Sequence, residues 1–444
     1  MSNRIIDLRA EQRPERAWLV GLEITSEESL FAIEDSLAEL SALATTAGAV
    51  VIGQTIQRLS APSSALYIGR GRANELATLA KDRDLDLIIV DDELSPSQQR
   101  NLEELTDVRV VDRTALILDI FAQHARTREG QMQVELAQLD YRLPRLTGKG
   151  TQLSRVGGGS RGSGGGGAAG AIGVRGPGET KLEIDRRRIR SRIAELRRDL
   201  EAVRAQRTQQ RRQRTGHAIP VVAIVGYTNA GKSTLFNALT TSNVLAENKL
   251  FATLDPTTRH VTLPTHQEVL LSDTVGFIQK LPTSLVASFR ATLEEVVEAD
   301  ILLEVVDITH ENAFEQSATV QQVLAELGAA DKPRVTALNK IDLLSDPSQV
   351  DVAPFPNAVP VSAVTRDGLD ALLRTLGQVL TEDMASLTAL IPYDRGDLVE
   401  IFHRRGQVRR QEAREDGTLI VGLAPRSVRG LLAPYRAEGD KAAL

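Results

Sequence analysis

The sequence predicts an α/β protein of four parts, and three observations support this. Apolar segments of strand length alternate with helical segments over residues 17–125 and again over 219–380, a pattern typical of parallel sheets with crossover helices. Two heptad patterns lie between these regions, and a short tail follows. The predicted parts are an N-terminal α/β domain (1–125), a long antiparallel helical hairpin (126–214), a second α/β domain (215–380) and a small C-terminal α/β domain (381–444).

Composition excludes several classes of protein. The 444 residues contain no cysteine, which excludes disulfides, thiol nucleophiles and cysteine–zinc sites. The six histidines are scattered without the spacing of metal ligands. No apolar run approaches the ~20 residues that span a bilayer, and the charged N-terminus is unlike a signal peptide. We therefore expect a cytoplasmic monomer with no membrane span.

The N-terminal domain is expected to contain four strands and three helices. A Gly69-Arg-Gly71 sequence lies inside it, but a lone G-x-G is weak and favours a helix-capping turn over a phosphate loop. The expected strands are 17–24, 49–56, 85–91 and 108–112, and the expected helices are 30–44, 72–81 and 96–105.

The hairpin is predicted from two apolar seams with heptad spacing. Between the seams, residues 157–178 contain 12 glycines in 22 positions, so this segment cannot bury enough apolar surface to order itself and should form the hairpin tip. The first seam is Met132, Leu136, Leu139 and Leu143; the second is Leu182, Ile189, Ile193, Leu196, Leu200 and Val203.

A phosphate-binding loop is predicted after the apolar run 221–225. The segment from 226 to 233 matches G-x-x-x-x-G-K-[ST] and leads into a helical segment, the context that this motif requires. Its backbone N–H groups and the helix N-terminus would bind phosphates, with Lys232 on the β- and γ-phosphates and Ser233 on Mg²⁺. The motif comprises Gly226, Tyr227, Thr228, Asn229, Ala230, Gly231, Lys232 and Ser233.

Two further segments are candidates for sensing the third phosphate. An Asp-Thr-Val-Gly sequence follows the apolar run 268–272; its Asp would hold Mg²⁺ through water, and the N–H of its Gly would bond the γ-phosphate. The loop from 251 to 258 offers three threonines that could close over Mg²⁺, and spacing does not choose between Thr253, Thr257 and Thr258. The candidates are Asp273, Thr274, Val275 and Gly276, with Phe251, Ala252, Thr253, Leu254 and Asp255.

A guanine pocket is predicted from an Asn-Lys-x-Asp sequence after the strand 334–338. The Asp342 carboxylate can accept two N–H bonds from guanine, whereas adenine would leave it unpaired; such a site rejects the wrong base by roughly 10⁴-fold or more. A Ser-Ala-Val sequence after the strand 358–361 would bond the guanine oxygen through its N–H groups. The pocket comprises Asn339, Lys340, Ile341 and Asp342, with Ser362, Ala363 and Val364.

These motifs resemble translation-factor-related GTPases, and more closely the HflX family. The resemblance rests on GYTNAGKS (226–233), FATLDPTTR (251–259), DTVG (273–276) and RGPGETKLEIDRRRIR (175–190). It implies a Mg²⁺-dependent GTPase that converts GTP to GDP, binds the large ribosomal subunit and dissociates stalled or idle ribosomes under stress. It also implies Thr253 as the loop's Mg²⁺ ligand. The chain departs from the family at Val364, where Lys is usual, and in its long glycine segment.

Hydrolysis needs a catalytic group other than the glutamine that many GTPases use. Phe277 follows Gly276 and cannot orient the attacking water, the role that Gln takes in many GTPases. In several related GTPases an Asn at the place of Asn229 helps to hold K⁺; alternatively Asn229 only tolerates the backbone angles of the loop, or the partner completes the site. The candidate catalytic residues are Lys232, Asn229, Thr253 and Gly276.

The second hairpin helix is a candidate RNA-binding element. Residues 180–214 carry a net charge of +8, so the rest of the chain carries −14. Clustered Arg side chains bind phosphate backbones by counterion release. The alternative is a solvated helix surface, but acidic residues are few in this segment, which favours RNA. Only 3% of residues are aromatic, so structured rRNA fits better than stacked single strands. The candidates are Arg186, Arg187, Arg188 and Arg190.

Three functions are compatible with this pattern. The first is a GTP-controlled factor that binds the large ribosomal subunit. The second is a GTPase acting in ribosome assembly or RNA remodelling without splitting ribosomes. The third is a nucleotide-gated scaffold whose hairpin binds protein helices, but this requires an exposed apolar seam, and the two seams look matched to each other.

Overall fold

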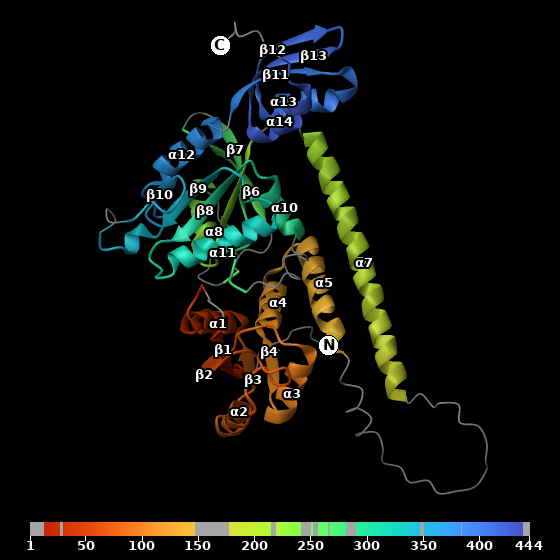
Figure 1. Ribbon diagram of the computed structural model, residues 1–444, viewed down its shortest axis with the longest axis vertical. Coiled ribbons are helices and arrows are strands. Elements are labelled where there is room, and N and C mark those ends of the chain that lie inside the picture. The colour runs from red at the N-terminus through yellow and green to blue at the C-terminus, as the bar shows by residue number, and fades with distance from the viewer. Residues whose placement is uncertain are drawn as a thin grey trace, which may run out of the picture. The chain divides into compact units, whose positions relative to one another are not determined.

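The computed structural model describes residues 13–26, 30–146, 177–214, 219–240, 250–251, 256–264, 267–280, 290–346, 350–382 and 384–437. The chain divides into two compact units. The first comprises Met1–Arg204 with Lys280–Phe289, and the second comprises Ala205–Gln279 with Arg290–Leu444. Three separate sheets lie within these units (Figure 1).

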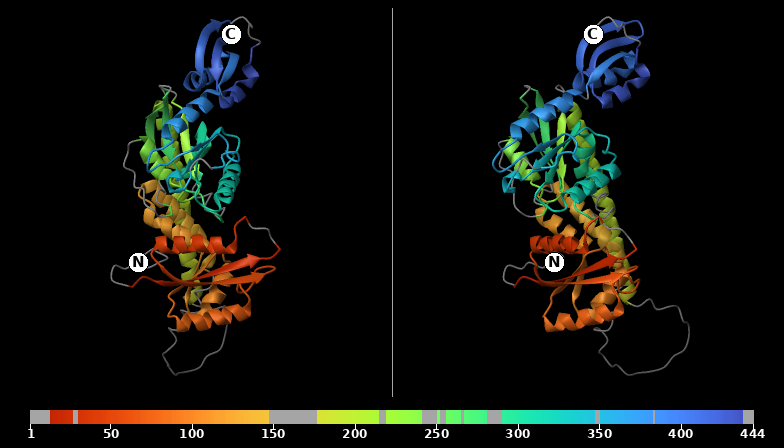
Figure 2. Two further views of the ribbon diagram at one scale, coloured as in Figure 1. Left: turned by 90° about the vertical axis from the view of Figure 1, so that its left-hand side faces the viewer. Right: turned by 60° about the vertical axis from the view of Figure 1, so that its left-hand side comes forward.

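The N-terminal sheet is parallel, as the alternating pattern predicts. Its order is β2-β1-β3-β4, and every pairing is parallel. Helix α1 lies on one face and α2 on the other (Figure 2), so helices cover both faces of the sheet. The strands are β1 (Arg16–Ile24), β2 (Val50–Leu59), β3 (Leu87–Val90) and β4 (Arg109–Asp112); the helices are α1 (Ile33–Ala47), α2 (Arg70–Asp82) and α3 (Pro96–Thr106).

A further helix, α4 (Arg113–His124), was not expected from the sequence. The side chain of Asp112 caps it by accepting a 2.8 Å hydrogen bond from Ala115 N. All residues from Arg113 to Phe121 are buried, so this helix lacks the polar face that gives an amphipathic period. Periodicity therefore could not identify it.

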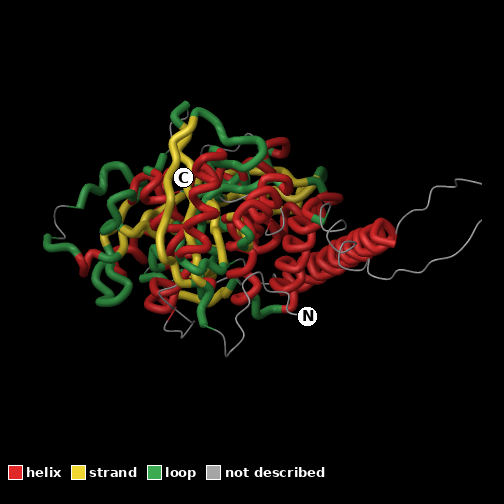
Figure 3. Tube along the Cα trace, turned by 90° about the horizontal axis from the view of Figure 1, so that it is seen from below, coloured by secondary structure: helices red, strands yellow, loops and turns green. Residues whose placement is uncertain are grey.

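Helices α5 (Arg128–Arg145) and α7 (Pro177–Arg214) contact each other through the described side chains of the two predicted seams. The side chain of Leu182 and residues 157–176 of the predicted tip lie outside the described part of the chain. Leu196 is fully buried at the centre of the cluster. Figure 3 shows that α7 is helical without a break. Two ion pairs border the seam, Arg192–Glu135 at 2.8 Å and Arg197–Asp140 at 3.3 Å. The cluster contains Met132, Leu136, Leu139, Leu143, Ile189, Ile193, Leu196, Leu200 and Val203.

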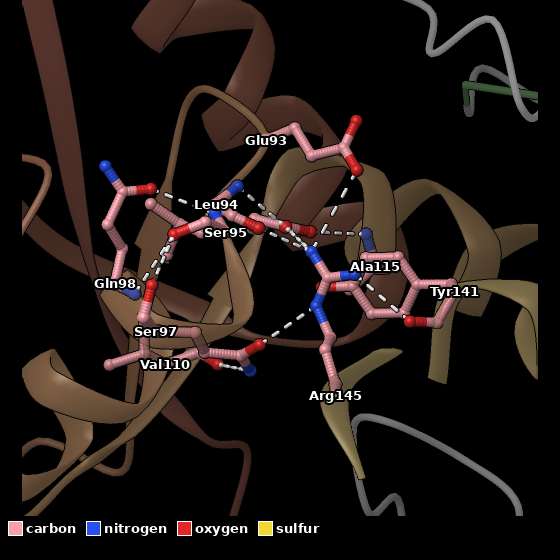
Figure 4. A network of polar contacts seen from close by, with 11 residues as sticks. Glu93, Leu94, Ser95, Ser97, Gln98, Val110, Ala115, Tyr141 and Arg145 are labelled. Atoms are coloured by element: carbon pink, nitrogen blue, oxygen red, sulfur yellow. Dashed lines mark hydrogen bonds and ion pairs between the residues drawn. The ribbon is translucent and has the colours of Figure 1, made fainter. Parts of the chain in front are cut away.

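Arg145 ties the end of α5 to the N-terminal sheet (Figure 4). Its Nη2 donates to the carbonyl of Leu94 at 2.6 Å and to Asp112 Oδ2 at 3.1 Å. Its guanidinium also lies 3.5 Å from the ring centroid of Tyr141. Burial raises the pKa of Asp112, and Arg145 partly offsets this. Arg145 thus compensates a buried carboxylate while it anchors the helix.

The second α/β domain has a six-stranded sheet of order β10-β9-β8-β5-β7-β6. Only β6, paired with β7, is antiparallel. Helices α8 and α12 pack on one face, and α10 and α11 lie on the other (Figure 1). The strands are β5 (Val221–Gly226), β6 (Thr257–Thr262), β7 (Glu268–Asp273), β8 (Ile301–Asp307), β9 (Arg334–Asn339) and β10 (Ala358–Pro360); the helices are α8 (Lys232–Thr240), α10 (Arg290–Glu298), α11 (Ala313–Glu326) and α12 (Leu369–Glu382).

The C-terminal sheet is antiparallel, with the order β11-β13-β12. Helices α13 and α14 cover one face through a core around Phe402, which is fully buried. No sequence pattern predicts strand β12, because its residues are mostly polar and do not alternate with apolar ones. None of the described helices is both long and apolar enough to cross a membrane. The elements are β11 (Ala385–Ile391), α13 (Gly396–Arg405), β12 (Gln407–Arg414), β13 (Gly417–Ala424) and α14 (Arg426–Leu431).

Candidate nucleotide-binding site

The predicted phosphate loop joins β5 to α8 at the carboxyl end of the sheet, where α/β folds bind ligands. Two of its positions require glycine. Gly226 has φ +146°, and an added Cβ would lie 2.3 Å from the carbonyl oxygen of Val305; Gly231 has φ +96°, and its Cβ would lie 2.3 Å from Asn339 Nδ2. Asn229 also has a positive φ of 61°, a conformation that Asn tolerates better than most residues. The backbone interpretation of Asn229 is therefore consistent with the structure.

Lys232 is the first residue of α8 and is almost completely buried, with 7% of its surface exposed. Its ammonium donates a 2.7 Å hydrogen bond to the carbonyl of Tyr227. Burial lowers the pKa of Lys232 to about 8, and the charge of Asp273 opposes this shift. A buried cation with so little compensation is a favourable partner for phosphate oxygens.

Two of the three predicted Mg²⁺ ligands, Ser233 and Asp273, lie together. The hydroxyl of Ser233 donates a 2.8 Å hydrogen bond to Asp273 Oδ2, although the two residues come from α8 and from the end of β7. Paired oxygen atoms of this kind fit Mg²⁺, which prefers hydroxyl, carboxylate and phosphate oxygens. Phe251 is buried. Ala252, Thr253, Leu254 and Asp255 lie outside the described residues.

Asn339 connects the phosphate loop to the predicted guanine loop. Its Nδ2 donates to the carbonyl of Ala230 at 2.9 Å, and its Oδ1 accepts from Ala363 N at 3.0 Å. The side chain is 2% exposed. One buried amide therefore sets the distance between the segment that would hold the phosphates and the segment that would hold the base.

Lys340 and Asp342 follow Asn339 in the predicted guanine loop. Lys340 has φ +71°, and its ammonium lies 2.6 Å from Asp307 Oδ2. Asp342 Oδ1 accepts a 2.6 Å hydrogen bond from the hydroxyl of Ser362. Ile341 begins the short 3-10 helix η1 (Ile341–Leu343). Val364 is 74% exposed, so its side chain is available to cover a base from solvent.

Asp307 is a site residue that sequence reasoning missed. It ends β8 and fixes the ammonium of Lys340, while its Oδ1 accepts from Thr309 N at 3.1 Å. A carboxylate at the carboxyl end of a parallel strand is a usable signal for a ligand site. Asp307 was not predicted from this signal, because it belongs to none of the expected motifs.

The segment after β7 lies beside the phosphate loop, as the motif order predicts. Thr274 is fully buried, and Val275 is 8% exposed. Gly276 lies against Lys232, since a Cβ added there would be 2.8 Å from Nζ. Phe277 is 1% exposed and therefore does not present a group to an attacking water. The other predicted site residues, Arg186, Arg187, Arg188 and Arg190, belong to α7 in the first compact unit.

The side-chain amide of Asn339 joins the phosphate loop after β5 to the Asn-Lys-x-Asp loop after β9. A phosphate loop combined with a guanine-binding loop defines the class of this protein, a P-loop GTPase. Family models match four consecutive segments of the chain between residues 34 and 427. They are a GTP-binding GTPase N-terminal domain (residues 34–122), a GTP-binding GTPase middle region (124–214), a 50S ribosome-binding GTPase domain (221–340) and an HflX C-terminal domain (350–427). The chain belongs to the HflX family of GTPases.

Relatives with this family name resemble the chain over most of its length. GTPase HflX of Caldanaerobacter subterraneus is 48% identical over 91% of this chain and 90% of that protein. GTPase HflX of Escherichia coli (strain K12) is 41% identical over 91% and 92%. Among solved structures, a GTP-binding protein of the archaeon Sulfolobus solfataricus in complex with GDP is 25% identical, covers 83% of this chain and 99% of that one, and has a TM-score of 0.42.

Proposed function

We propose that this GTPase binds the large ribosomal subunit when GTP is bound, dissociates stalled or idle ribosomes under stress, and leaves after hydrolysis. The match of residues 221–340 to a 50S ribosome-binding GTPase domain is the observation that carries the proposal. The cluster of arginines on α7 supports it independently. Binding close to the surface shared with the small subunit would couple attachment to subunit separation.

The arginines of α7 are the proposed rRNA contacts. Arg187, Arg188 and Arg190 are exposed, and Arg186 is partly so. Among the described side chains, these four form no ion pair, in contrast to Arg192 and Arg197 further along the helix. Exposed guanidinium groups without acidic partners are available to phosphate oxygens, and each would release counterions from RNA.

Co-sedimentation with purified large subunits tests this proposal. The variant reverses Arg186, Arg187, Arg188 and Arg190 to Glu, and the measurement uses a non-hydrolysable GTP analogue at two salt concentrations. The matched control reverses four exposed cations of the N-terminal domain, Arg70, Arg72, Lys81 and Arg83, and so has the same net charge. We expect wild type and control to pellet and to weaken with salt, and the α7 variant to stay in solution. If the α7 variant pellets as well as wild type, α7 is not the RNA-binding element.

For hydrolysis, each residue of the site has a proposed role. Lys232 would bind the β- and γ-phosphates, Ser233 would hold Mg²⁺ directly and Asp273 would hold it through water. When bound, Mg²⁺ neutralises charge that develops on the phosphate oxygens. Gly276 N–H would bond the γ-phosphate while water attacks its phosphorus and the bond to the β-phosphate oxygen breaks. Thr253 would close the Mg²⁺ site.

Splitting is tested separately from binding. Intact ribosomes incubated with the protein and the GTP analogue should separate into subunits on a sucrose gradient. Attachment to intact ribosomes or to large subunits, without separation, would favour the assembly or remodelling alternative. GTP turnover measured with and without large subunits then shows whether the partner completes the catalytic site; we expect low intrinsic turnover and stimulation by the subunit.

A further inference from the structure

The segment that would sense the third phosphate is held on the phosphate loop by a short backbone ladder. Tyr227 and Phe277 form a parallel β-bridge. Thr228 N donates to the carbonyl of Phe277 at 2.8 Å, and Phe277 N donates to the carbonyl of Gly226 at 3.1 Å. Both bonds join main-chain atoms, so no side-chain substitution removes them directly.

A third bond in the same place depends on a side chain. The hydroxyl of Tyr227 accepts a 2.9 Å hydrogen bond from the backbone N–H of Gln279. Tyr227 is only 4% exposed, so its ring is fixed by packing and the hydroxyl has a defined position. This bond attaches the segment to the phosphate loop at Gln279, two residues after Phe277.

Tyr227 also holds the lysine of the site. Its carbonyl accepts from Lys232 Nζ at 2.7 Å. Gly276 packs directly on the same ammonium, since an added Cβ would lie 2.8 Å from Nζ and 2.9 Å from Thr228 Cγ2. The face of Gly276 toward the phosphate loop therefore lies against Lys232 and Thr228.

We propose that the Tyr227 hydroxyl is a positioning group that holds residues 276–279 against the phosphate loop and thereby favours GDP over GTP. The N–H of Gly276 would bond a γ-phosphate and has no such partner in a diphosphate. Moving Gly276 toward a γ-phosphate strains the bond from Gln279 to Tyr227, so the hydroxyl opposes binding of the triphosphate and leaves binding of the diphosphate almost unchanged. The proposal rests on GTP binding at this loop and is independent of the ribosome.

The test is Tyr227→Phe, which keeps the buried ring and removes only the acceptor. We expect the ratio of GMPPNP affinity to GDP affinity to rise roughly two- to tenfold, the range that one hydrogen bond of this kind contributes. The Gln279 amide in the GDP complex should exchange hydrogen faster than in wild type. The matched control is Tyr393→Phe, which removes a tyrosine hydroxyl that bonds the carbonyl of Arg414 at 2.8 Å in the C-terminal sheet and should change neither quantity.

A measurement on the wild-type protein needs no variant. The Gln279 amide should be more protected from exchange with GDP bound than with GMPPNP bound. An unchanged affinity ratio in Tyr227→Phe, or a ratio that falls, overturns the proposal, and so does equal protection in the two wild-type complexes. If mutation of Lys232 abolishes GDP binding while Tyr227→Phe has no effect, the site assignment survives and only the positioning role fails.

Discussion

The hydroxyl of Ser362 donates a 2.6 Å hydrogen bond to Oδ1 of Asp342. The two residues lie in different loops, after β10 and after β9, and the bond fixes the rotation of the carboxylate. The same Ser362 oxygen accepts from Thr365 N at 3.0 Å, so the hydroxyl is itself held in place. A carboxylate oriented in this way presents a fixed edge to the two N–H donors of guanine.

We predict that Asp342→Asn changes the preferred base from guanine to xanthine. The new amide offers an N–H where guanine also has a donor, whereas xanthine offers a keto oxygen at that position. We expect GDP affinity to fall by at least ~100-fold, because buried donors would be left unpaired, and XDP affinity to rise. Competition of GDP and XDP for a fluorescent nucleotide measures this. Retained preference for GDP would show that Asp342 does not contact the base.

We predict that nucleotide binding takes up a proton at about pH 9. Burial lowers the pKa of Lys232 from 10.5 to about 8, so the side chain is mostly neutral at that pH and phosphate binding would protonate it. Between these two values the unfolded chain binds more protons than the folded chain, so this group's contribution to stability rises with pH across the window. Calorimetry of GDP binding in buffers of different ionisation enthalpy should show close to one proton taken up at about pH 9 and much less at about pH 7.5. Equal uptake at both pH values would contradict the assignment.

A third prediction separates the two interpretations of Asn229. Its φ of 61° means that Asn229→Ala would strain the loop and remove the side chain together. Asn229→Gly removes the side chain and keeps the conformation accessible. If the side chain helps to hold K⁺, wild-type turnover should slow when Na⁺ replaces K⁺, and Asn229→Gly should bind GDP normally and lose that difference. Turnover by wild type at equal rates in both salts would leave Asn229 with a backbone role alone.

Sequence patterns indicated which loops the structure brings together, but they missed some of the surrounding elements, and the reason is physical. Phosphate and guanine loops need particular residues at fixed spacing, so the spacing alone assigns roles to Gly231, Ser233 and Asn339. Helix α4 has no polar face, and strand β12 has no apolar face. Neither segment therefore shows the alternation of polar and apolar residues from which helices and strands are predicted. The bond between Tyr227 and Gln279 joins residues 52 positions apart, and such a pairing depends on the path of two loops that no local pattern encodes.

The last prediction concerns Lys280, which belongs to the first compact unit. Its ammonium lies 2.6 Å from both Asp91 Oδ2 and Asp92 Oδ1. Asp91 is fully buried and also pairs with Arg113 at 2.8 Å; burial raises its pKa, and Lys280 lowers it. Lys280→Met should therefore destabilise this unit by ~1–3 kcal/mol at neutral pH, less than the loss of a whole buried pair because Arg113 remains.

The pH dependence distinguishes this charge effect from lost packing. Without Lys280 the pKa of Asp91 rises further, so its carboxyl group is protonated more readily. In acid the neutral carboxyl group no longer requires a neighbouring cation. The penalty of Lys280→Met, measured by scanning calorimetry, should accordingly be smaller at about pH 5 than at about pH 8. Arg13→Met is the control, since Arg13 pairs with Asp84 at 2.9 Å but both side chains are more than half exposed, and such surface pairs contribute ~0–1 kcal/mol. A penalty equal to that of Arg13→Met at both pH values would mean that Lys280 does not stabilise the buried carboxylate.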